Sequence, residues 1–223
     1  MFDQLRIGDK YSYDDFLASV AERKIKKPKK KVIKETVPHS NKTYDFSKIN
    51  GEIYWEEREL EYILELDADT PEELEELKIA LSNWLMNVME EDLFDPYIED
   101  YHFKATYDDM DCDDEEVEKT TVTVKFTAYP YMLSNDEKIY SVTIPTDEPL
   151  TVKVKNNSSH RITPTLVADV GSVTFELNGS SYSIGEGETT DSSLMVPVGE
   201  SDFIIQPGET GGNLTIKFRE EVF

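Results

Sequence analysis

Few side chains in this 223-residue sequence stand at spacings that support chemistry. Asp109, Asp111 and Asp113 repeat the D-x-D-x-D opening of a calcium-binding loop. A helix–loop–helix calcium loop also needs glycine at its sixth position and glutamate at its twelfth, where this sequence has Asp114 and Thr120. We therefore predict no structural metal site, and weak cation binding by the three aspartates stays open as an alternative.

Residues of the kinds used in catalysis are present but not grouped. His39, His102 and His160 lie far apart in the sequence and form none of the patterns of a histidine metal site. The sequence contains no G-x-S-x-G nucleophile motif, no Walker A motif and no G-x-G-x-x-G motif. Carboxylates are so numerous that no pair stands out as the acid and nucleophile of a glycosidase. We predict no catalytic residues, no cofactor and no enzymatic activity.

Charge is the strongest feature of the composition. Acidic residues outnumber basic ones by 47 to 23, which gives a formal net charge of −24 at pH 7. A charge of this size repels nucleic acid and keeps copies of a protein apart in solution. The composition therefore disfavours direct recognition of nucleic acid.

Two further features limit where the protein works. The single cysteine, Cys112, excludes an internal disulfide and a cysteine-based metal cluster, and we interpret it as a residue at a hairpin tip without a role. No apolar run approaches the ~18 residues of a membrane helix. The first residues lack the basic and then apolar pattern of a signal peptide. We expect no membrane association and no export by the usual route.

The positive charge is concentrated in one stretch. Residues 23–34 are strongly basic, whereas residues 52–118 carry most of the acid. Pro28 and the lack of apolar periodicity predict an extended arm or loop. This segment is either a contact arm that reaches an acidic neighbouring subunit or a solvated loop, and nucleic-acid binding ranks third because no aromatic residue is interleaved. The lysines of the predicted arm are Lys24, Lys26, Lys27, Lys29, Lys30 and Lys31.

One helix is predicted over residues 71–90. Thr70 is placed as its N-cap, Pro71 occupies the first turn, and Glu73 completes a Thr-x-x-Glu capping box. Leucines recur at spacings of three and four and give the helix one apolar stripe. Its first turns carry a group of acids where the helix dipole favours negative charge. These acids are Glu72, Glu73, Glu75 and Glu76.

Strands flank the helix. Residues 60–66 alternate between apolar and charged side chains, which is typical of a half-buried strand. Residues 101–107 and 120–128 alternate in the same way, and the acidic segment between them predicts a β-hairpin with a charged tip. The order of elements predicts an α+β N-terminal domain, residues 1–144, in which one main helix packs on an antiparallel, barrel-like sheet.

The composition of the sequence changes at residue 145. Short strands recur between turn signals such as Asn178-Gly179 and Pro207-Gly208-Glu209. We predict an all-β sandwich of jelly-roll type over residues 145–223. The predicted strands cover residues 150–154, 163–168, 172–177, 181–184, 193–196, 202–205 and 213–219.

The jelly roll raises the possibility of sugar binding, which usually needs exposed aromatic side chains. Phe175, Phe203 and Phe218 stand at alternating strand positions and are predicted to lie in the core. Tyr182 remains as a candidate platform for sugar stacking, with turn or edge packing as the alternative.

The order of motifs along the chain resembles that of a known family. A Val-Pro turn is followed by Tyr44-Asp45-Phe46, by Gly51, and by a strand that begins near Arg58. The N-terminal domain ends near Tyr129-Pro130-Tyr131, and Pro207-Gly208-Glu209 precedes an alternating closing strand. Each motif is degenerate and their order is specific. The chain resembles, over nearly its whole length, the distal tail proteins of bacteriophages with long non-contractile tails.

This resemblance implies a structural protein of the virion. Its N-terminal domain would form a six-membered ring that caps the tail tube, and its second, galectin-like domain would point outward. The ring would join the tail tube protein to the tail-tip lysin and the receptor-binding proteins. The resemblance also implies a phage or prophage of a Gram-positive host, with synthesis in the host cytoplasm and a final location at the tail tip.

A closed ring requires a heterologous interface, in which one surface of a subunit meets a different surface of its neighbour. We predict that the basic arm, residues 24–31, is one half, and that the acidic face at residues 72–76 or 108–116 is the other. Six copies would carry 6 × −24 = −144 charges, and a negative bore would repel DNA and keep it moving.

A different class of function stays open from the sequence. A monomeric carbohydrate-binding or adhesion protein would use the jelly roll as its active part. That hypothesis predicts affinity for a saccharide and no ring.

Overall fold

The structure is a computed structural model that describes residues 3–39, 41–48, 52–115, 119–209 and 211–223. The chain forms two compact units, Met1–Met132 with Phe223 (unit 1) and Leu133–Val222 (unit 2). The sequence places the boundary between the domains after residue 144. The boundary in the structure lies one strand earlier, because β10 (Met132–Thr143) pairs with the last strand of unit 2.

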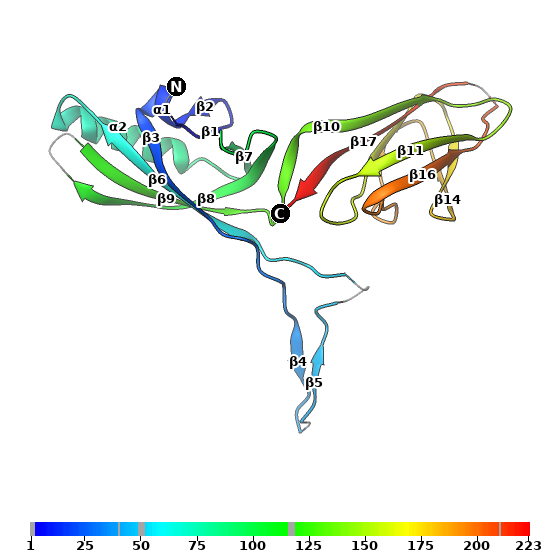
Figure 1. Ribbon diagram of the computed structural model, residues 1–223, viewed down its shortest axis with the longest axis horizontal. Coiled ribbons are helices and arrows are strands. Elements are labelled where there is room, and N and C mark those ends of the chain that lie inside the picture. The colour runs from blue at the N-terminus through cyan, green and yellow to red at the C-terminus, as the bar shows by residue number, and fades with distance from the viewer. Residues whose placement is uncertain (1–2, 40, 49–51, 116–118, 210) are drawn as a thin grey trace. The chain divides into compact units, whose positions relative to one another are not determined.

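Unit 1 is built on a single antiparallel sheet in the order β2-β1-β7-β8-β9-β6-β3 (Figure 1). Backbone and side-chain contacts also join the two ends of this sheet. The backbone N–H of Val20 on β3 donates to Asp3 O at 2.8 Å, just before β1. The predicted antiparallel sheet with one main helix is present. Its strands are β1 (Arg6–Ile7), β2 (Lys10–Tyr11), β3 (Ala18–Ile25), β6 (Arg58–Asp67), β7 (Glu91–Phe94), β8 (Tyr101–Glu115) and β9 (Lys119–Ala128).

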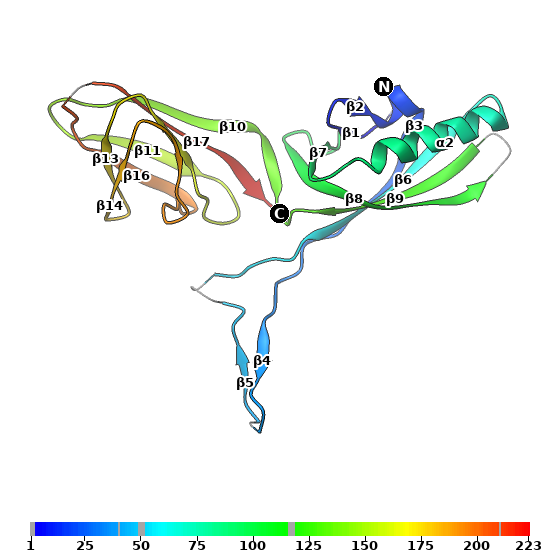
Figure 2. The ribbon, with the colours of Figure 1, turned by 180° about the vertical axis from the view of Figure 1, so that it is seen from behind.

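The central strand β6 separates the core from the outside. Leu60, Tyr62, Leu64 and Leu66 are each at most 1% exposed, as their alternation predicts. They lie opposite the inward residues of β9 and beneath the helix α2 (Pro71–Leu85). Figures 1 and 2 show α2 along one face of β6 and β9, which leaves the other face of these strands without a covering helix.

Helix α2 begins as predicted and ends earlier. Thr70 Oγ1 accepts a hydrogen bond from the backbone N–H of Glu73 at 3.2 Å, which confirms the N-cap. The regular helix stops at Leu85, because the chain must turn before β7, and Glu90 takes a left-handed φ of 55° in that turn. The predicted last turn, up to residue 90, is therefore not helical.

Two short elements precede β3. Residues 8 and 9 form a turn, with Gly8 at φ 62°, a conformation that favours glycine. After it comes a short helix, α1 (Ser12–Phe16), which the sequence analysis did not predict. Phe16 stacks on Trp84 of α2 with ring centroids 4.7 Å apart. The aromatic pair fixes α1 against α2.

The acidic segment after residue 107 is strand and not a loose turn. Asp109 pairs with Lys125 and Cys112 with Val122 across β8 and β9, with two register shifts along the way. The interpretation of Cys112 as a tip residue is therefore wrong, because it is an exposed residue within β8. Threonines and lysines of β9 pair with the acidic residues of β8. The pairing of the two strands therefore continues through the segment whose acidic composition predicted a turn.

Between β3 and β6 the chain forms an arm, residues 26–57. Its two strands are joined by backbone bonds from Glu56 to Lys29 and from Lys31 to Tyr54, both at most 2.9 Å long. Further out, β4 (Lys34–Thr36) and β5 (Thr43–Asp45) make a separate two-stranded sheet, visible in both views (Figures 1 and 2). The predicted extended conformation of the basic stretch is confirmed.

Unit 2 consists of two antiparallel sheets around one core. One sheet has the order β11-β16-β13-β14, and in the other β10 is followed by β17, β12 and β15. Phe175, Phe203 and Phe218 are at most 5% exposed and lie in this core, as predicted. The strands are β11 (Leu150–Asn156), β12 (Thr165–Ala168), β13 (Val173–Leu177), β14 (Ser180–Ile184), β15 (Gly187–Thr190), β16 (Gly199–Ile205) and β17 (Asn213–Val222).

Most predicted strands of unit 2 are present, and one is not. Asn178 and Gly179 both have positive φ, 53° and 78°, as a tight hairpin between β13 and β14 requires. Residues 193–196 contribute a single bridge, from Val196 to Ile162. A strand that was not predicted, β15, pairs with the edge of β12 instead. Short apolar runs are ambiguous because they fit a core-facing loop as well as a strand.

Gly212 packs where a side chain has no room. A Cβ there would lie 2.2 Å from Cγ1 of Val170 and 2.7 Å from Oδ1 of Asp169. We expect Gly212→Ala to reduce the free energy of unfolding of unit 2 by about 1–3 kcal/mol through overpacking. The matched control is Gly211→Ala, where a Cβ meets nothing within 4 Å. Scanning calorimetry of both variants checks this, and equal melting temperatures would contradict it.

Candidate functional site

The base of the arm is fixed by a buried arginine. Arg58 is 2% exposed and begins β6, where the arm rejoins the sheet. Its Nε donates to Lys26 O at 3.0 Å on the outgoing strand, and its Nη1 donates to Pro130 O at 3.5 Å. Burial lowers the pKa of the Arg58 guanidinium from its ordinary value. The side chain ties both strands of the arm to the end of β9.

A second charged cluster holds β3 near the arm. Arg23 donates through Nε to both oxygens of Asp95, at 3.0 and 2.8 Å, and also pairs with Asp3. Burial opposes the charge of Arg23, but the hydrogen bond to Asp3 and the carboxylate of Asp95 outweigh it and raise the pKa of Arg23. The Asp95 side chain is fully buried, so this ion pair fixes the geometry of the sheet.

The outer part of the arm exposes apolar side chains that it cannot bury itself. Two strands alone have no core, because a hairpin has no third layer to cover its faces. Among exposed large apolar residues, the arm supplies Val32 (59%), Val37 (50%), Tyr44 (41%), Phe46 (45%) and Tyr54 (47%). Large apolar side chains that are exposed together on one element are typical of interaction surfaces.

The predicted arm lysines have different surroundings. Lys24 pairs with Glu61 at 2.8 Å and Lys26 pairs with Glu59, so these two are bound to the acidic strand of their own chain. Lys27 donates to Phe223 O at 3.3 Å, and Lys30 lies over the Trp55 ring.

Two lysines of the arm remain available for contacts. Lys29 and Lys31 are exposed and have no ion pair among the residues that the structure describes. They follow Pro28 on the outgoing strand of the arm. The structure thus singles out these two from the six predicted interface lysines.

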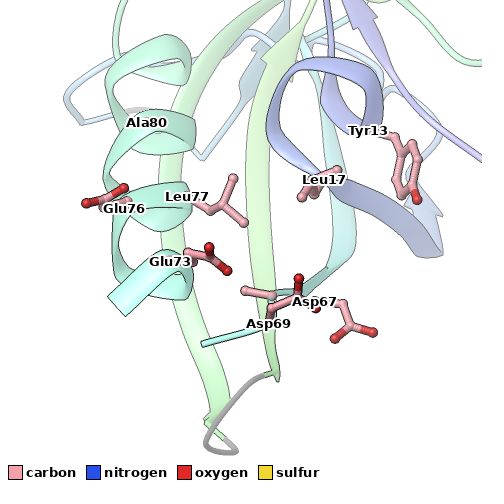
Figure 3. A pocket seen from close by; sticks show the side chains of 9 residues that line it. Tyr13, Leu17, Asp67, Asp69, Glu73, Glu76, Leu77 and Ala80 are labelled. Carbon is pink, nitrogen blue, oxygen red and sulfur yellow. The ribbon is translucent and has the colours of Figure 1, made fainter. Parts of the chain in front are cut away.

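The four predicted interface acids of α2 also have different surroundings. Glu73 and Glu76 line a groove between α2 and the end of α1, whereas Glu72 and Glu75 lie outside its lining. Glu75 accepts from Lys78 at 2.7 Å along the helix. Of the four predicted interface acids, Glu73 directs its side chain into this recess, whereas the side chain of Glu76 points away from Leu77 and Glu73 (Figure 3).

The groove has a volume of about 720 Å³ and combines an apolar floor with an acidic rim. Figure 3 shows Leu77 and Glu73 directed from α2 toward Leu17 and the segment that follows β6. Leu17 is 44% exposed in a left-handed backbone conformation at the end of α1. The residues that line the groove are Tyr13, Leu17, Asp67, Ala68, Asp69, Glu73, Glu76, Leu77 and Ala80.

The face of the sheet opposite α2 is polar and acidic. Lys24 and Lys125 pair there with Glu61 and Asp111, at 2.8 and 3.2 Å. Hydrogen bonding to Asp111 raises the pKa of Lys125. Carboxylates outnumber lysines on this face, which also carries a row of threonines. By strand register the face comprises Ser19, Glu22, Lys24, Glu59, Glu61, Ile63, Glu65, Asp67, Thr106, Asp109, Asp111, Lys119, Thr121, Thr123, Lys125 and Thr127.

No metal-binding arrangement occurs among the residues that the structure describes. Asp109 and Asp111 lie on the extended strand β8 and share Lys125, at 3.8 and 3.2 Å. The backbone there does not form a calcium loop, because it is part of a hydrogen-bonded ladder. Of the histidines, His39 is exposed in the arm, His102 is buried against Phe94, and His160 lies 3.2 Å from Glu221.

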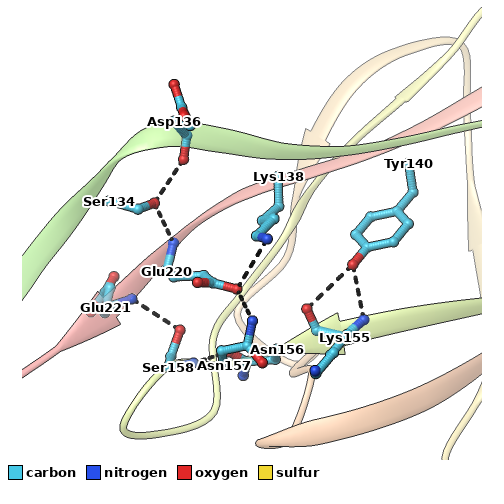
Figure 4. A network of polar contacts seen from close by, with 10 residues as sticks. All are labelled: Ser134, Asp136, Lys138, Tyr140, Lys155, Asn156, Asn157, Ser158, Glu220 and Glu221. Atoms are coloured by element: carbon cyan, nitrogen blue, oxygen red, sulfur yellow. Dashed lines mark hydrogen bonds and ion pairs between the residues drawn. The ribbon is translucent and has the colours of Figure 1, made fainter. Parts of the chain in front are cut away.

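Unit 2 contains a buried polar network, drawn in Figure 4. Glu220 is 6% exposed; its carboxylate accepts from Asn157 Nδ2 at 2.7 Å, and its backbone N–H donates to Ser134 Oγ at 2.9 Å. Next to it Ser158 Oγ accepts from the backbone N–H of Glu221 at 2.9 Å. These contacts attach the loop after β11 to β17, a structural role in which each polar group is bonded.

Tyr182, the candidate for sugar stacking, is used in packing. Its ring stacks on Phe175 with centroids 5.6 Å apart and planes inclined by 17°. Its hydroxyl donates to Ser193 O at 3.5 Å. This environment is the edge packing that the sequence left as the alternative.

No protein-family model matches this chain, and no curated protein matches it. Among solved structures, the Dit protein (gp 19.1) of phage SPP1 matches with a TM-score of 0.71 and 13% sequence identity, covering 98% of this chain and 99% of that one. The SPP1 protein is described as a paradigm of the hub adsorption apparatus in phages that infect Gram-positive bacteria.

This chain has the fold of a phage Dit protein. The match spans both units, so the resemblance in motif order is confirmed at the level of the fold. The phage P2 baseplate also matches, with a TM-score of 0.40 and 10% identity with calcium, and 0.42 and 8% with strontium. Those two scores are too low to support an argument. In the described parts of the chain, no helix is long and apolar enough to cross a membrane.

The groove on the Dit fold was not predicted, since its two sides come from separate parts of the sequence. The charge of Glu73 could be recognised in the sequence, whereas Leu17 follows α1, a helix that the sequence does not predict. The left-handed end of α1 that exposes Leu17 has no glycine or asparagine to indicate it.

Arg58 offers a test of how the arm is anchored. We expect Arg58→Ala to lower the free energy of unfolding of unit 1 by about 2–4 kcal/mol, because two backbone carbonyls lose their buried donor. Urea unfolding followed by tryptophan fluorescence reports on this unit, since both tryptophans, Trp55 and Trp84, lie in it. The control Lys125→Ala removes an exposed cation from the same sheet. A loss no larger than that of the control would show that Arg58 is not the anchor.

Proposed function

We propose that this protein is the subunit of a hub ring at the distal end of a phage tail. The observation that carries the proposal is the match in fold to the SPP1 Dit protein over 98% of this chain, which includes the arm-bearing unit and the sandwich. The ring would join the tail tube protein on one side to the tail-tip lysin and receptor-binding proteins on the other. The protein would act as a structural part and not as an enzyme.

The arm supports a role in self-assembly. Its exposed apolar side chains are costly to leave in water in a single chain, whereas they become stabilising when a neighbour covers them. A hairpin that projects from one subunit and binds a different surface on the next makes a heterologous contact, and such contacts close into rings. The proposed stoichiometry is six.

The helix-free face of the sheet suits the inner surface of such a ring. It lacks large apolar side chains apart from Ile63, and its excess of carboxylates gives it a negative potential. A bore lined in this way would repel the DNA that passes through the tail. The polar network and the packed Tyr182 of unit 2 give no specific support to sugar binding, so unit 2 is proposed as an outward attachment domain.

Native mass by light scattering after size exclusion tests the ring. We expect a species near six times 25.6 kDa, about 154 kDa, that dissociates as protein concentration falls. The triple variant Val32→Ser, Ile33→Ser, Tyr44→Ser should weaken association about 100-fold, since three apolar contacts of roughly 1 kcal/mol each are lost. The control Ile139→Ser, Val198→Ser removes equally exposed apolar residues from unit 2 and should leave the mass unchanged.

A monomer at every concentration would contradict assembly of the ring from this chain alone. An oligomer that is equally sensitive to both sets of substitutions would show that association is non-specific.

A further inference from the structure

The residue that follows the last strand of unit 2 packs at the base of the arm. Strand β17 ends at Val222 in unit 2, and the next residue, Phe223, belongs to unit 1. The centroid of the Phe223 ring lies 4.6 Å from that of Trp55, with the two planes inclined by 65°. The ring of Tyr131 is its other neighbour, with centroids 4.8 Å apart. Phe223 therefore joins an aromatic residue of the arm to one that follows β9.

Phe223 contacts both strands of the arm. On the returning strand its ring packs on Trp55, and on the outgoing strand its backbone oxygen accepts a hydrogen bond from Lys27 Nζ at 3.3 Å. Trp55 also forms an antiparallel bridge with Lys30, whose Nζ lies 5.9 Å from the centroid of the Trp55 ring. The contacts of Phe223 thus lie at the pairing that joins the two strands of the arm beyond Arg58.

The arm has little else to hold it closed at this level. Two paired strands without a third layer are only marginally stable in water. Trp55 is half-buried, whereas Tyr54 and Ile53 before it are exposed. Trp55 has the Phe223 ring to pack against, and an edge-to-face pair of aromatic rings stabilises by more than the area it buries.

Arg58 does not replace this contact. Its side chain holds Lys26 O and Pro130 O where the arm leaves the sheet, and Trp55 lies three positions further along the arm. Tyr131 follows Pro130, so both anchors of the arm use the segment after β9. The second anchor, unlike the first, depends on a residue from the end of β17.

We infer that Phe223 is a latch that keeps the base of the arm closed. With its ring packed on Trp55 and Tyr131, residues 29–31 and 54–56 stay paired; without it they open locally while the sheet of unit 1 stays folded. Because Phe223 is continuous with β17, the latch makes the order of the arm depend on the last strand of unit 2. The inference goes beyond the proposed ring, since it concerns the arm of a single chain.

Amide hydrogen exchange of the full-length protein tests the latch. The amides of Lys31 and Glu56 report on the base of the arm, because they donate to Tyr54 O and Lys29 O across its two strands. Phe223→Ala should speed their exchange about 10-fold, since the aromatic contact no longer opposes local opening. The amides of β6 and β9 should exchange as in the unchanged protein.

Two control variants accompany this measurement. Val222→Ala removes an apolar side chain one position earlier, where alternation along the strand directs it to the opposite side, and should leave the exchange at the arm base unchanged. Phe223→Tyr keeps the ring and should also leave it unchanged. All proteins are measured below the concentration at which the native mass begins to rise, so that no neighbouring copy protects the arm.

A double-mutant cycle tests the pair of rings itself. Trp55→Ala alone should speed exchange at the arm base at least as much as Phe223→Ala, because it also removes the ring near Lys30. The double variant should exchange at about the rate of Trp55→Ala alone, since the contact is already lost in the single variant. Independent residues would instead multiply their effects, to about 100-fold.

Three results would overturn the inference. Unchanged exchange at the arm base in Phe223→Ala would show that the arm is held without the latch. Equal acceleration in β6 and β9 would show that Phe223 supports unit 1 as a whole and not the arm. Multiplying effects in the cycle would show that Trp55 and Phe223 act separately. Each of these results leaves the proposed ring standing, because none of them measures association.

Discussion

The pairing of β6 with its two neighbours is the constraint on which unit 1 depends. Because side chains alternate along a strand, β6 turns Leu60, Tyr62, Leu64 and Leu66 toward α2 and turns its glutamates to the opposite face. A slip of one residue would exchange the two faces and bury the acids. The same strand carries the arm at one end and the groove at the other. One register thus fixes which side chains of β6 form the core and which form the outer face of the sheet.

Net charge shapes how copies of this chain can meet. A charge of −24 per subunit opposes association, so a ring must be held by contacts that are local and strong enough to overcome the repulsion. Repulsion between distant exposed charges is screened beyond about 8 Å at physiological ionic strength, while contacting ion pairs and buried apolar surface persist. The arm carries residues suited to both kinds of contact, since its lysines and its exposed apolar residues are adjacent in sequence. An acidic protein with a single basic segment is suited to one specific contact.

The sequence predicts the regular parts of the fold because they rest on local patterns. The N-cap at Thr70 and the apolar stripe of α2 define the helix, and alternation defines β6 and β9. The prediction from sequence is wrong where tertiary pairing overrides composition. The acidic segment at residues 108–115 lacks the residues of a good strand, yet the threonines and lysines of β9 hold it in the ladder.

The candidate site, like the fold, could be predicted from the sequence only in part. The arm lysines and the acids of α2 could be identified by charge, but nothing local indicates which of them are paired within their own chain. Lys24 and Lys26 are neutralised by Glu61 and Glu59 only because β3 and β6 are neighbours, a contact far apart in sequence. Leu17 lines the groove because its backbone is left-handed at the end of α1, a conformation that no glycine or asparagine in the sequence indicates. Only the structure therefore shows which of these charged residues are already paired within the chain.

Electron microscopy of the associated protein tests the central claim, a closed head-to-tail ring, most directly. Class averages of concentrated protein should show rings with sixfold symmetry and a central opening, as closed heterologous contacts between neighbouring subunits require. Two-fold symmetric dimers would contradict the account, because they would mean that one surface of the subunit binds its own copy. Open filaments would contradict it as well, since the contact would then not close.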